Sequence, residues 1–167
     1  MTARATSTAE HADPRYRLTL VSPSANDWWQ RYHEIRKAEL FDARGRGYVY
    51  NPNHPDEKKL GNYPFLLMVS GQGIGVVRLD HLPSPIIKTA AIRLVAITQT
   101  EQGRGHGRAL HNEVERLALK QGVSLLVVNA AVRAVGFYAK LGYARHVWDD
   151  PSKGLDAAFV QMAKLIP

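Results

Sequence analysis

The chain has 167 residues and no cysteine, and 45% of its residues are hydrophobic and 22% charged. This length and composition predict one compact domain with its own core, and the lack of cysteine excludes disulfides, thiolate metal ligands and a cysteine nucleophile. A formal net charge of +7 favours an anionic partner, either a phosphorylated small molecule or a nucleic acid.

The first 14 residues contain Ala, Thr, Ser and charged side chains without a hydrophobic period, and they end at Pro14. They predict a flexible N-terminal arm at 1–14, ahead of a domain at 15–167.

The start of the chain lacks the apolar centre of a secretory signal, and no apolar run approaches the roughly 20 residues that cross a bilayer. We therefore expect a cytoplasmic protein with no membrane partner.

Periodic spacing of apolar residues predicts the first elements of the domain, namely a strand at 16–21, a helix within 22–41, and strands at 64–70 and 73–80. The Gly-Gln-Gly segment between the last two strands is typical of a tight hairpin. Residues 45–64 are punctuated by Gly, Pro and Asn and predict a loop with one short helix near 56–60. This loop is expected to form one wall of a substrate cleft.

The second half predicts strands at 88–98, 123–130, 143–150 and 156–166, with helices at 107–121 and 132–141. Gly122 and Gly142 are placed to end the two helices. The strand at 123–130 is apolar on both faces, so it is expected in the centre of the sheet. This order of elements predicts an α/β domain whose mixed sheet includes a right-handed crossover.

A glycine-rich loop lies between the strand at 88–98 and the helix at 107–121, with the sequence "QGRGHG" at 102–107. It is not a Walker loop, because it continues as Gly107-Arg108-Ala109 and offers no hydroxyl for magnesium. It is not a dinucleotide fingerprint either, because Arg108 stands where the third glycine is needed. What remains is a glycine loop at a helix N-terminus, where backbone N–H groups and the helix dipole favour a phosphate.

Two motifs resemble those of the Gcn5-related N-acetyltransferases. "QGRGHG" is similar to the Gln/Arg-x-x-Gly-x-Gly/Ala signature that binds the pyrophosphate of acetyl-coenzyme A, and "FYAKLGY" at 137–143 is similar to the Phe-Tyr-x-Lys-x-Gly-Phe segment downstream. The likeness covers roughly 16–166 and is clearest from 92 to 143. It implies a single domain with a mixed sheet of about six to seven strands, splayed fourth and fifth strands, and about four helices.

The resemblance also implies a coenzyme site. Two strand residues, Val95 and Ile97, match positions whose backbone meets the pantetheine amides. The loop and the arginines at its rim match the pyrophosphate site, and these residues are Gln102, Gly103, Arg104, Gly105, His106, Gly107 and Arg108. Ala131 stands where the family often has Asn, so Asn129 or Arg133 is the candidate replacement for that contact.

By the same resemblance, Tyr138 is the catalytic residue, the tyrosine that protonates the departing thiolate. Independently, a phenol on the inward face of a short helix can place its hydroxyl in a cleft while its ring packs, although a plain core tyrosine is the alternative. The general base is not evident, because 88–98 contains no carboxylate. Asp80, His81 and Glu39 are candidates, and each is more simply read as a solvated surface residue.

No metal site is expected. His106 and His111, and the group of His54, Asp56 and Glu57, lack the spacing of zinc or iron motifs. Trp28 and Trp29 are candidates for contact with a substrate, with helix packing the commoner role for at least one of them.

The leading hypothesis is an N-acetyltransferase that moves an acetyl group from acetyl-CoA to a primary amine of a small molecule or peptide, by direct attack in a ternary complex. The alternatives are a non-catalytic acyl-CoA sensor of the same fold and, least favoured because basic residues are scattered, a nucleic-acid binder. The sequence leaves the amine acceptor and the oligomeric state open, a homodimer included.

Overall fold

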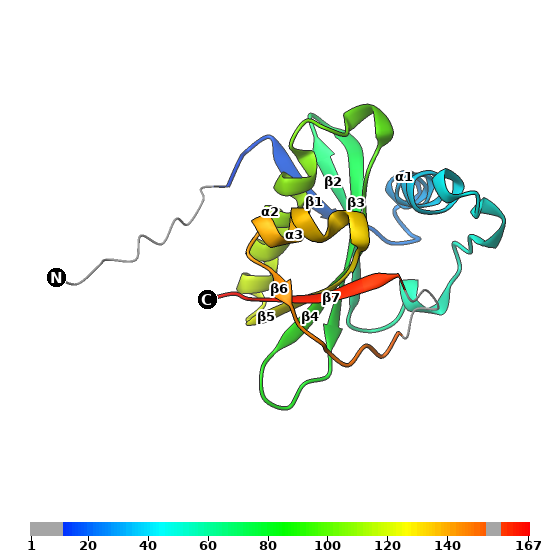
Figure 1. Ribbon diagram of the computed structural model, residues 1–167. Coiled ribbons are helices and arrows are strands. Elements are labelled where there is room, and N and C mark those ends of the chain that lie inside the picture. The colour runs from blue at the N-terminus through cyan, green and yellow to red at the C-terminus, as the bar shows by residue number, and fades with distance from the viewer. Residues whose placement is uncertain (1–11, 153–157) are drawn as a thin grey trace.

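The structure is a computed structural model that describes residues 12–152 and 158–167. Most of the predicted N-terminal arm, residues 1–11, lies outside the described residues. Seven strands form one mixed sheet in the order β1-β2-β3-β4-β5-β7-β6 (Figure 1). Their bounds are β1 Tyr16–Leu20, β2 Asn62–Val69, β3 Gln72–Leu82, β4 Thr89–Ile97, β5 Leu125–Ala131, β6 Ala144–Arg145 and β7 Phe159–Leu165.

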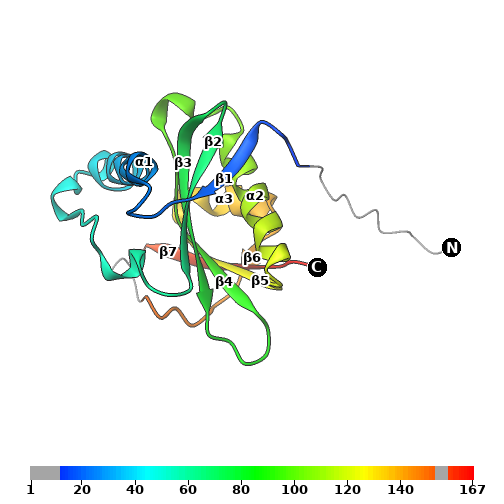
Figure 2. The same ribbon diagram turned by 180° about the vertical axis from the view of Figure 1, so that it is seen from behind.

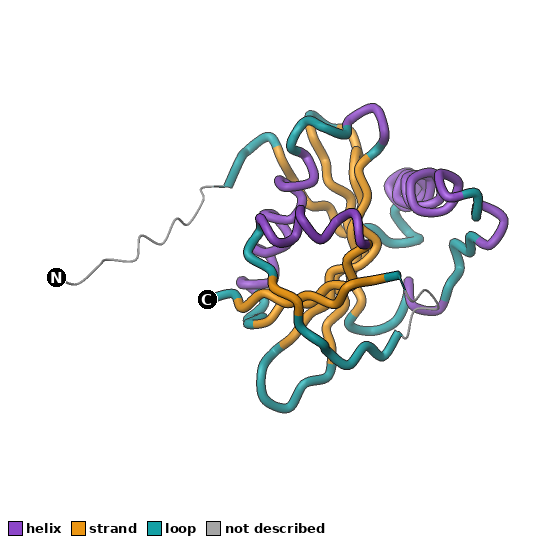
Figure 3. Tube along the Cα trace, in the orientation of Figure 1, coloured by secondary structure: helices purple, strands orange, loops and turns teal. Residues whose placement is uncertain are grey.

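Three α-helices are described, where about four helices were expected: α1 Asn26–Arg36, α2 His106–Lys120 and α3 Val135–Lys140. Helices α2 and α3 cover one face of the sheet and α1 lies against the other, as the two opposite views show (Figures 1 and 2). The remaining helical segments are single turns, and Figure 3 shows them between the longer elements. The short helix expected near 56–60 is one of these turns, Pro55–Glu57.

The apolar residues of β2 and β3 are divided between two cores, one on each face of the sheet, as the period of a strand requires. In β3, Val77 and Leu79 belong to the large core under α2 and α3, while Val76 belongs to the smaller core under α1. In β5, the residues Leu126–Val128 are all buried, and the strand lies between β4 and β7. The expectation of a central strand covered on both faces is therefore confirmed.

Strands β4 and β5 are parallel and separate along their length. They are paired from Thr89 with Leu125 to Ile92 with Val128, and no further pair follows. Just beyond, β4 contains a bulge at Leu94, whose φ of 57° is unusual for a residue with a side chain. A bulge bends its strand and shifts the alternation by one residue, so it explains why β4 turns away from β5. The predicted splay of the fourth and fifth strands is confirmed.

Two local expectations differ from the structure. The turn between β2 and β3 is formed by Ser70 and Gly71, both with positive φ, so it comes one residue earlier than expected. The strand expected at 143–150 pairs only over Ala144–Arg145. Beyond it the side chain of Gln161 replaces the ladder, because its amide accepts from the N–H and donates to the C=O of Trp148.

No helix within 12–152 and 158–167 is long and apolar enough to cross a membrane.

Candidate functional site

The separation of β4 and β5 opens into a cavity of about 460 Å³. Its walls come from both splayed strands, from the segment that follows α1, from the start of α3 and from the chain that precedes β7. Its polar lining includes Arg36, Arg44, Asp56, Arg93, Asn129, Arg133, Tyr138 and Asp150. The loop at 45–64, which was expected to form one wall, contributes His54, Asp56 and Glu57.

The glycine loop leads from the far end of β4 into α2. Gly103 and Gly105 have φ of 75° and 82°, a conformation that favours glycine. A side chain added at either position would meet no protein atom within 4 Å, so the loop faces open space. Gly105 is the N-cap of α2 and provides no side-chain cap, which leaves N–H groups of the first helical turn available. This geometry fits a phosphate group at the helix N-terminus.

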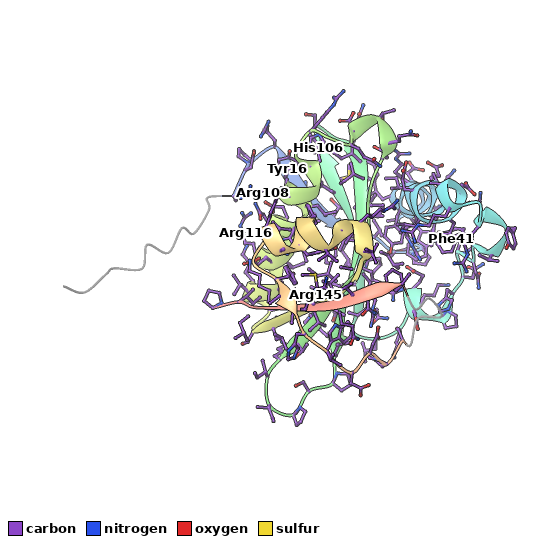
Figure 4. All side chains as sticks on the ribbon, in the orientation of Figure 1. Tyr16, Phe41, His106, Arg108, Arg116 and Arg145 are labelled. Carbon is purple, nitrogen blue, oxygen red and sulfur yellow. The ribbon has the colours of Figure 1, made fainter. Side chains whose placement is uncertain are left out.

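Two polar side chains of the loop hold it in place. His106 Nδ1 lies 2.8 Å from the Tyr16 hydroxyl, which ties the start of α2 to β1. Gln102 donates to the backbone O of Ile97 at 2.9 Å. Figure 4 shows Tyr16, His106 and Arg108 gathered at this end of α2. Any ligand contact from this part of the loop is therefore expected from its backbone rather than from these two side chains.

Arginines stand at the rim of the loop. Arg104 and Arg108 are exposed, and together with Arg15 and Arg116 they line a groove of about 420 Å³ beside Gly105. Arg104 has one weak partner, Glu101 at 3.5 Å. A cationic rim around free backbone N–H groups is suited to a polyphosphate ligand.

Val95 and Ile97 lie on β4 beyond the bulge, where β5 is no longer paired to it. Because of the bulge both side chains pack on the core under α2 and α3, and Val95 also lines the cavity. The edge of β4 that faces β5 at this level is left without a strand partner. Backbone groups on such an edge can hydrogen-bond an extended ligand.

Tyr138 lines the same cavity from α3 and is 6% exposed. Its ring packs at right angles to those of Phe137 and Tyr143. Among the described residues its hydroxyl has no hydrogen-bond partner. Burial raises the pKa of Tyr138 to about 12, so the phenol is protonated at neutral pH, as an ordinary tyrosine also is, and has a proton to donate.

The three candidate bases all have partners. Asp80 is 3% exposed, so its reading as a solvated surface residue was wrong. It accepts hydrogen bonds from Arg78 at 2.7 Å and Arg93 at 2.8 Å. Glu39 accepts from the backbone N–H of Gln99 at 3.0 Å, and His81 lies 2.7 Å from the side chain of Gln121. None of the three lines the cavity between β4 and β5.

A chain of ion pairs with alternating charges runs along the cavity wall. It was not predicted from the sequence. Glu57 pairs with Arg36 and, at 3.1 Å, with Arg78, while Asp80 joins Arg78 to Arg93. Arg93 continues the chain to Asp150 at 2.7 Å. A signal was present, because Arg78 and Arg93 interrupt apolar strand segments, and a charge inside a sheet requires a partner.

Asp150 lies where the two strands separate. Arg93 and Asn129 directly follow the last paired residues of β4 and β5, and both donate to the Asp150 carboxylate, Asn129 at 2.5 Å. Partial burial raises the pKa of Asp150, but hydrogen bonds from Arg93, the N–H of Ser152 and Asn129 outweigh it and hold the pKa below its usual value. Asp150 is thus a carboxylate bridge across the fork. Asn129, expected near the coenzyme, places its amide on that bridge.

The remaining candidates have local roles. Trp29 packs on the core under α1, whereas Trp28 is 40% exposed, so helix packing accounts for one of the two tryptophans. His54 lines the cavity, and its Nδ1 accepts from the N–H of Asp56 at 3.2 Å. His111 is buried and its Nε2 lies 2.8 Å from the Tyr143 hydroxyl. Within the part of the chain that the structure describes, no three His, Asp or Glu side chains are grouped to hold a metal.

The arrangement agrees with comparisons to solved structures. Tetrahymena Gcn5 matches with a TM-score of 0.66 at 17% identity, over 90% of this chain and 96% of that one. The ribosomal-protein-S18-alanine N-acetyltransferase of Escherichia coli matches with a TM-score of 0.67 at 15% identity, over 90% and 94%. A chimera of the Vibrio cholerae spermidine N-acetyltransferase with a second enzyme matches with a TM-score of 0.69 at 16% identity, over 90% and 95%. These likenesses show a shared fold.

The sequence comparison goes further than the fold. A family model described as an acetyltransferase (GNAT) domain matches residues 51–166, which is more than half of the chain. The matched segment contains the glycine loop, the splayed strands and Tyr138. This chain therefore belongs to the GNAT family of acetyltransferases, the Gcn5-related N-acetyltransferases.

Proposed function

We propose that this protein transfers an acetyl group from acetyl-CoA to a primary amine of a small molecule or peptide, by direct attack in a ternary complex. One observation carries the proposal: Tyr138 and Val95 line the cavity between the splayed strands and also line, together with Gly107 at the end of the glycine loop, a small adjoining apolar pocket. The family supplies acetyl-CoA as the expected acetyl donor.

In this proposal the coenzyme pyrophosphate binds the backbone N–H groups at the start of α2, with Arg104 and Arg108 at the rim. The pantetheine arm follows the free edge of β4 at Val95 and Ile97. The thioester then reaches the cavity at the fork, beside Tyr138. Positioning of this kind supplies a large part of the rate of a two-substrate reaction.

The reaction needs a neutral amine, a thioester carbonyl and a proton for the leaving sulfur. The amine nitrogen bonds to the carbonyl carbon, the carbon–sulfur bond breaks, and the thiolate takes the proton of the Tyr138 hydroxyl. The proton that the amine loses leaves through solvent, and Tyr138 is then protonated again. Because a phenol of ordinary or raised pKa is protonated at neutral pH, Tyr138 is in the required state before each turnover.

A second candidate function, an acyl-CoA sensor without catalysis, is favoured by the state of the carboxylates. Asp80 and Glu57 are locked in ion pairs, so the described cleft offers no free buried carboxylate to serve as a base. A sensor would bind the coenzyme through the same loop and release no thiol.

The experiment that separates the two measures thiol release from acetyl-CoA with a panel of amines, and coenzyme affinity by calorimetry. The solved relatives are named for a protein alanine and for spermidine, so the panel covers an α-amine, a polyamine and a lysine peptide. Thiol release that depends on an amine supports the acetyltransferase. Coenzyme binding without thiol release from any amine would support the sensor instead, and no coenzyme binding would contradict both.

A further inference from the structure

The charges that line the cleft do not all have partners. The chain Arg36–Glu57–Arg78–Asp80–Arg93–Asp150 alternates in sign and is neutral as a whole. Its members are buried, with at most 12% of each side chain exposed. An incoming substrate therefore meets a wall whose own charges already cancel.

Two further guanidinium groups line the cavity outside this chain. Arg44 lies in the turn Asp42–Arg44 that follows α1, and Arg133 lies in the turn Val132–Ala134 that follows β5. Both are exposed, and neither has a hydrogen bond or ion pair among the described residues. The two positive charges thus stand in one cavity, on segments that are far apart in the sequence.

Asp56 lines the same cavity, and Arg44, Arg133 and Asp56 are together called the mouth of the cleft. The carboxylate of Asp56 is one-third exposed. Its nearest cation is Arg78 at 4.0 Å, a looser contact than those of the buried chain, and His54 Nδ1 lies 3.8 Å away. The mouth therefore combines two unpaired cations with one weakly held anion. A substrate with only positive charge would be repelled twice and attracted once.

Arg36, whose charge Glu57 balances within the buried chain, lines the same cavity. It is 5% exposed, and its Nε has no hydrogen-bond partner among the described residues. Its guanidinium lies over the rings of Tyr32 and Tyr50, at 5.3 and 5.7 Å from their centroids. Arg36 therefore leaves one N–H donor unused, and an unused buried donor favours a hydrogen-bond acceptor beside it.

We propose that the acceptor is an amine that also carries an anionic group, a carboxylate or a phosphate, and that Arg44 and Arg133 bind this group. The amine then reaches the thioester near Tyr138, with Asp56 as the counter-charge for its ammonium form. Guanidinium groups suit both anions because they donate two parallel hydrogen bonds to a pair of oxygens. This inference names the substrate class of the site and rests on the proposed acetyltransferase function.

The test uses pairs of amines that differ only in the anionic group: alanine against alaninamide, and phosphoethanolamine against ethanolamine. Binding of each to the CoA-saturated protein is measured by calorimetry, and thiol release is measured with acetyl-CoA. We expect the anionic member of at least one pair to bind about tenfold more tightly, and the pair that shows it separates carboxylate from phosphate. Arg44→Gln and Arg133→Gln should each remove most of this preference.

Arg145→Gln is the matched control, because Arg145 is exposed on β6 and does not line the cavity (Figure 4). It should leave the preference unchanged, and all three variants should bind CoA as the parent does. Equal binding of anionic and neutral amines would overturn the inference. If both kinds of amine then also gave thiol release, the proposed acetyltransferase function would still be supported. Anion-dependent binding without thiol release would support the site and contradict catalysis. Weaker CoA binding by Arg133→Gln, with amine binding unchanged, would assign that arginine to the coenzyme and overturn the inference.

Discussion

Tyr138 and Tyr143 are neighbouring buried phenols whose ring centroids lie 5.3 Å apart, and they differ in what their hydroxyl groups contact. The Tyr143 hydroxyl is bound to His111 Nε2 at 2.8 Å. The Tyr138 hydroxyl has no such partner among the described residues and faces the cleft. A hydroxyl without a protein partner at a cleft contributes little to stability and is available to a substrate, so Tyr143 is the matched control for Tyr138.

Tyr138→Phe should lower kcat by about 10²- to 10⁴-fold, the usual range for loss of a general acid. The KM for acetyl-CoA should change little, because the phenol acts only as the carbon–sulfur bond breaks. The thermal midpoint should stay close to that of the parent, since no hydrogen bond is lost. Steady-state kinetics and a thermal melt on the same preparation measure all three quantities.

Tyr143→Phe is the control for this prediction. It removes a buried hydrogen bond and should destabilise the fold by about 1 kcal/mol while leaving turnover of the folded protein unchanged. If Tyr138→Phe behaved in the same way, with a lowered midpoint and normal kcat, Tyr138 would be a core residue and the sensor hypothesis would gain.

At the scale of elements, the glycine loop depends on backbone conformation more than on side chains. Gly105→Val should abolish detectable coenzyme binding, because a β-branched side chain disfavours a φ of 82° and would occupy the space above the loop. Calorimetry with CoA measures the affinity, and circular dichroism checks that the fold remains.

The control for Gly105 is Gly71→Val in the turn between β2 and β3. Gly71 has a φ of 78° and open space around its Cβ position, so the substitution imposes similar backbone strain away from the loop. Its affinity for CoA should equal that of the parent. Equal affinity in the Gly105 variant would show that the coenzyme binds elsewhere.

Asp150 bridges the fork between β4 and β5 by accepting from Arg93 and Asn129. Asp150→Ala leaves Asn129 and one edge of Arg93 without their acceptor, so we expect the free energy of unfolding to fall by about 2 to 4 kcal/mol. Urea denaturation measures this loss. Asp149→Ala is the control, because the neighbouring Asp149 is exposed and should tolerate the change. Similar small losses in both variants would mean that the bridge does not hold the fork.

Most elements were predictable because their signals are local. Apolar period, cap glycines and the strand–loop–helix order around 102–107 were enough to place β4, α2 and β5 and to predict the splay by resemblance. The segment after β6 was not predictable in this way. It ends its pairing because Gln161, an internal residue of β7, satisfies the backbone of Trp148 with its side chain, and such a contact leaves no periodic pattern.

At the scale of the whole molecule, the site joins segments that no local pattern connects. Glu57 comes from a turn, Arg78 and Arg93 from adjacent strands, and Asp150 from the chain before β7. Two arginines inside apolar strands show that acidic partners must exist, but only the fold shows which ones. The position and conformation of the glycine loop were therefore predictable from the sequence, while the charged wall of the cavity was not.

The whole fold should also lose stability in mildly acidic solution, because two histidines are buried in neutral form on opposite sides of the sheet. Burial, helped by Arg36, lowers the pKa of His33 to about 4, and burial, helped by Lys164, does the same for His111. Their ordinary value is 6.5, so between these limits the unfolded chain binds more protons than the folded one. The stabilisation is complete above about pH 6.5 and is lost as the pH falls toward about 4.

Urea denaturation across this range should show that the free energy of unfolding falls with pH. The double variant His33→Gln and His111→Gln should weaken this pH dependence, whereas His146→Gln, at an exposed position, should not. A fall confined to below pH 4 would assign acid sensitivity to carboxylates such as Asp150 and contradict the histidine explanation.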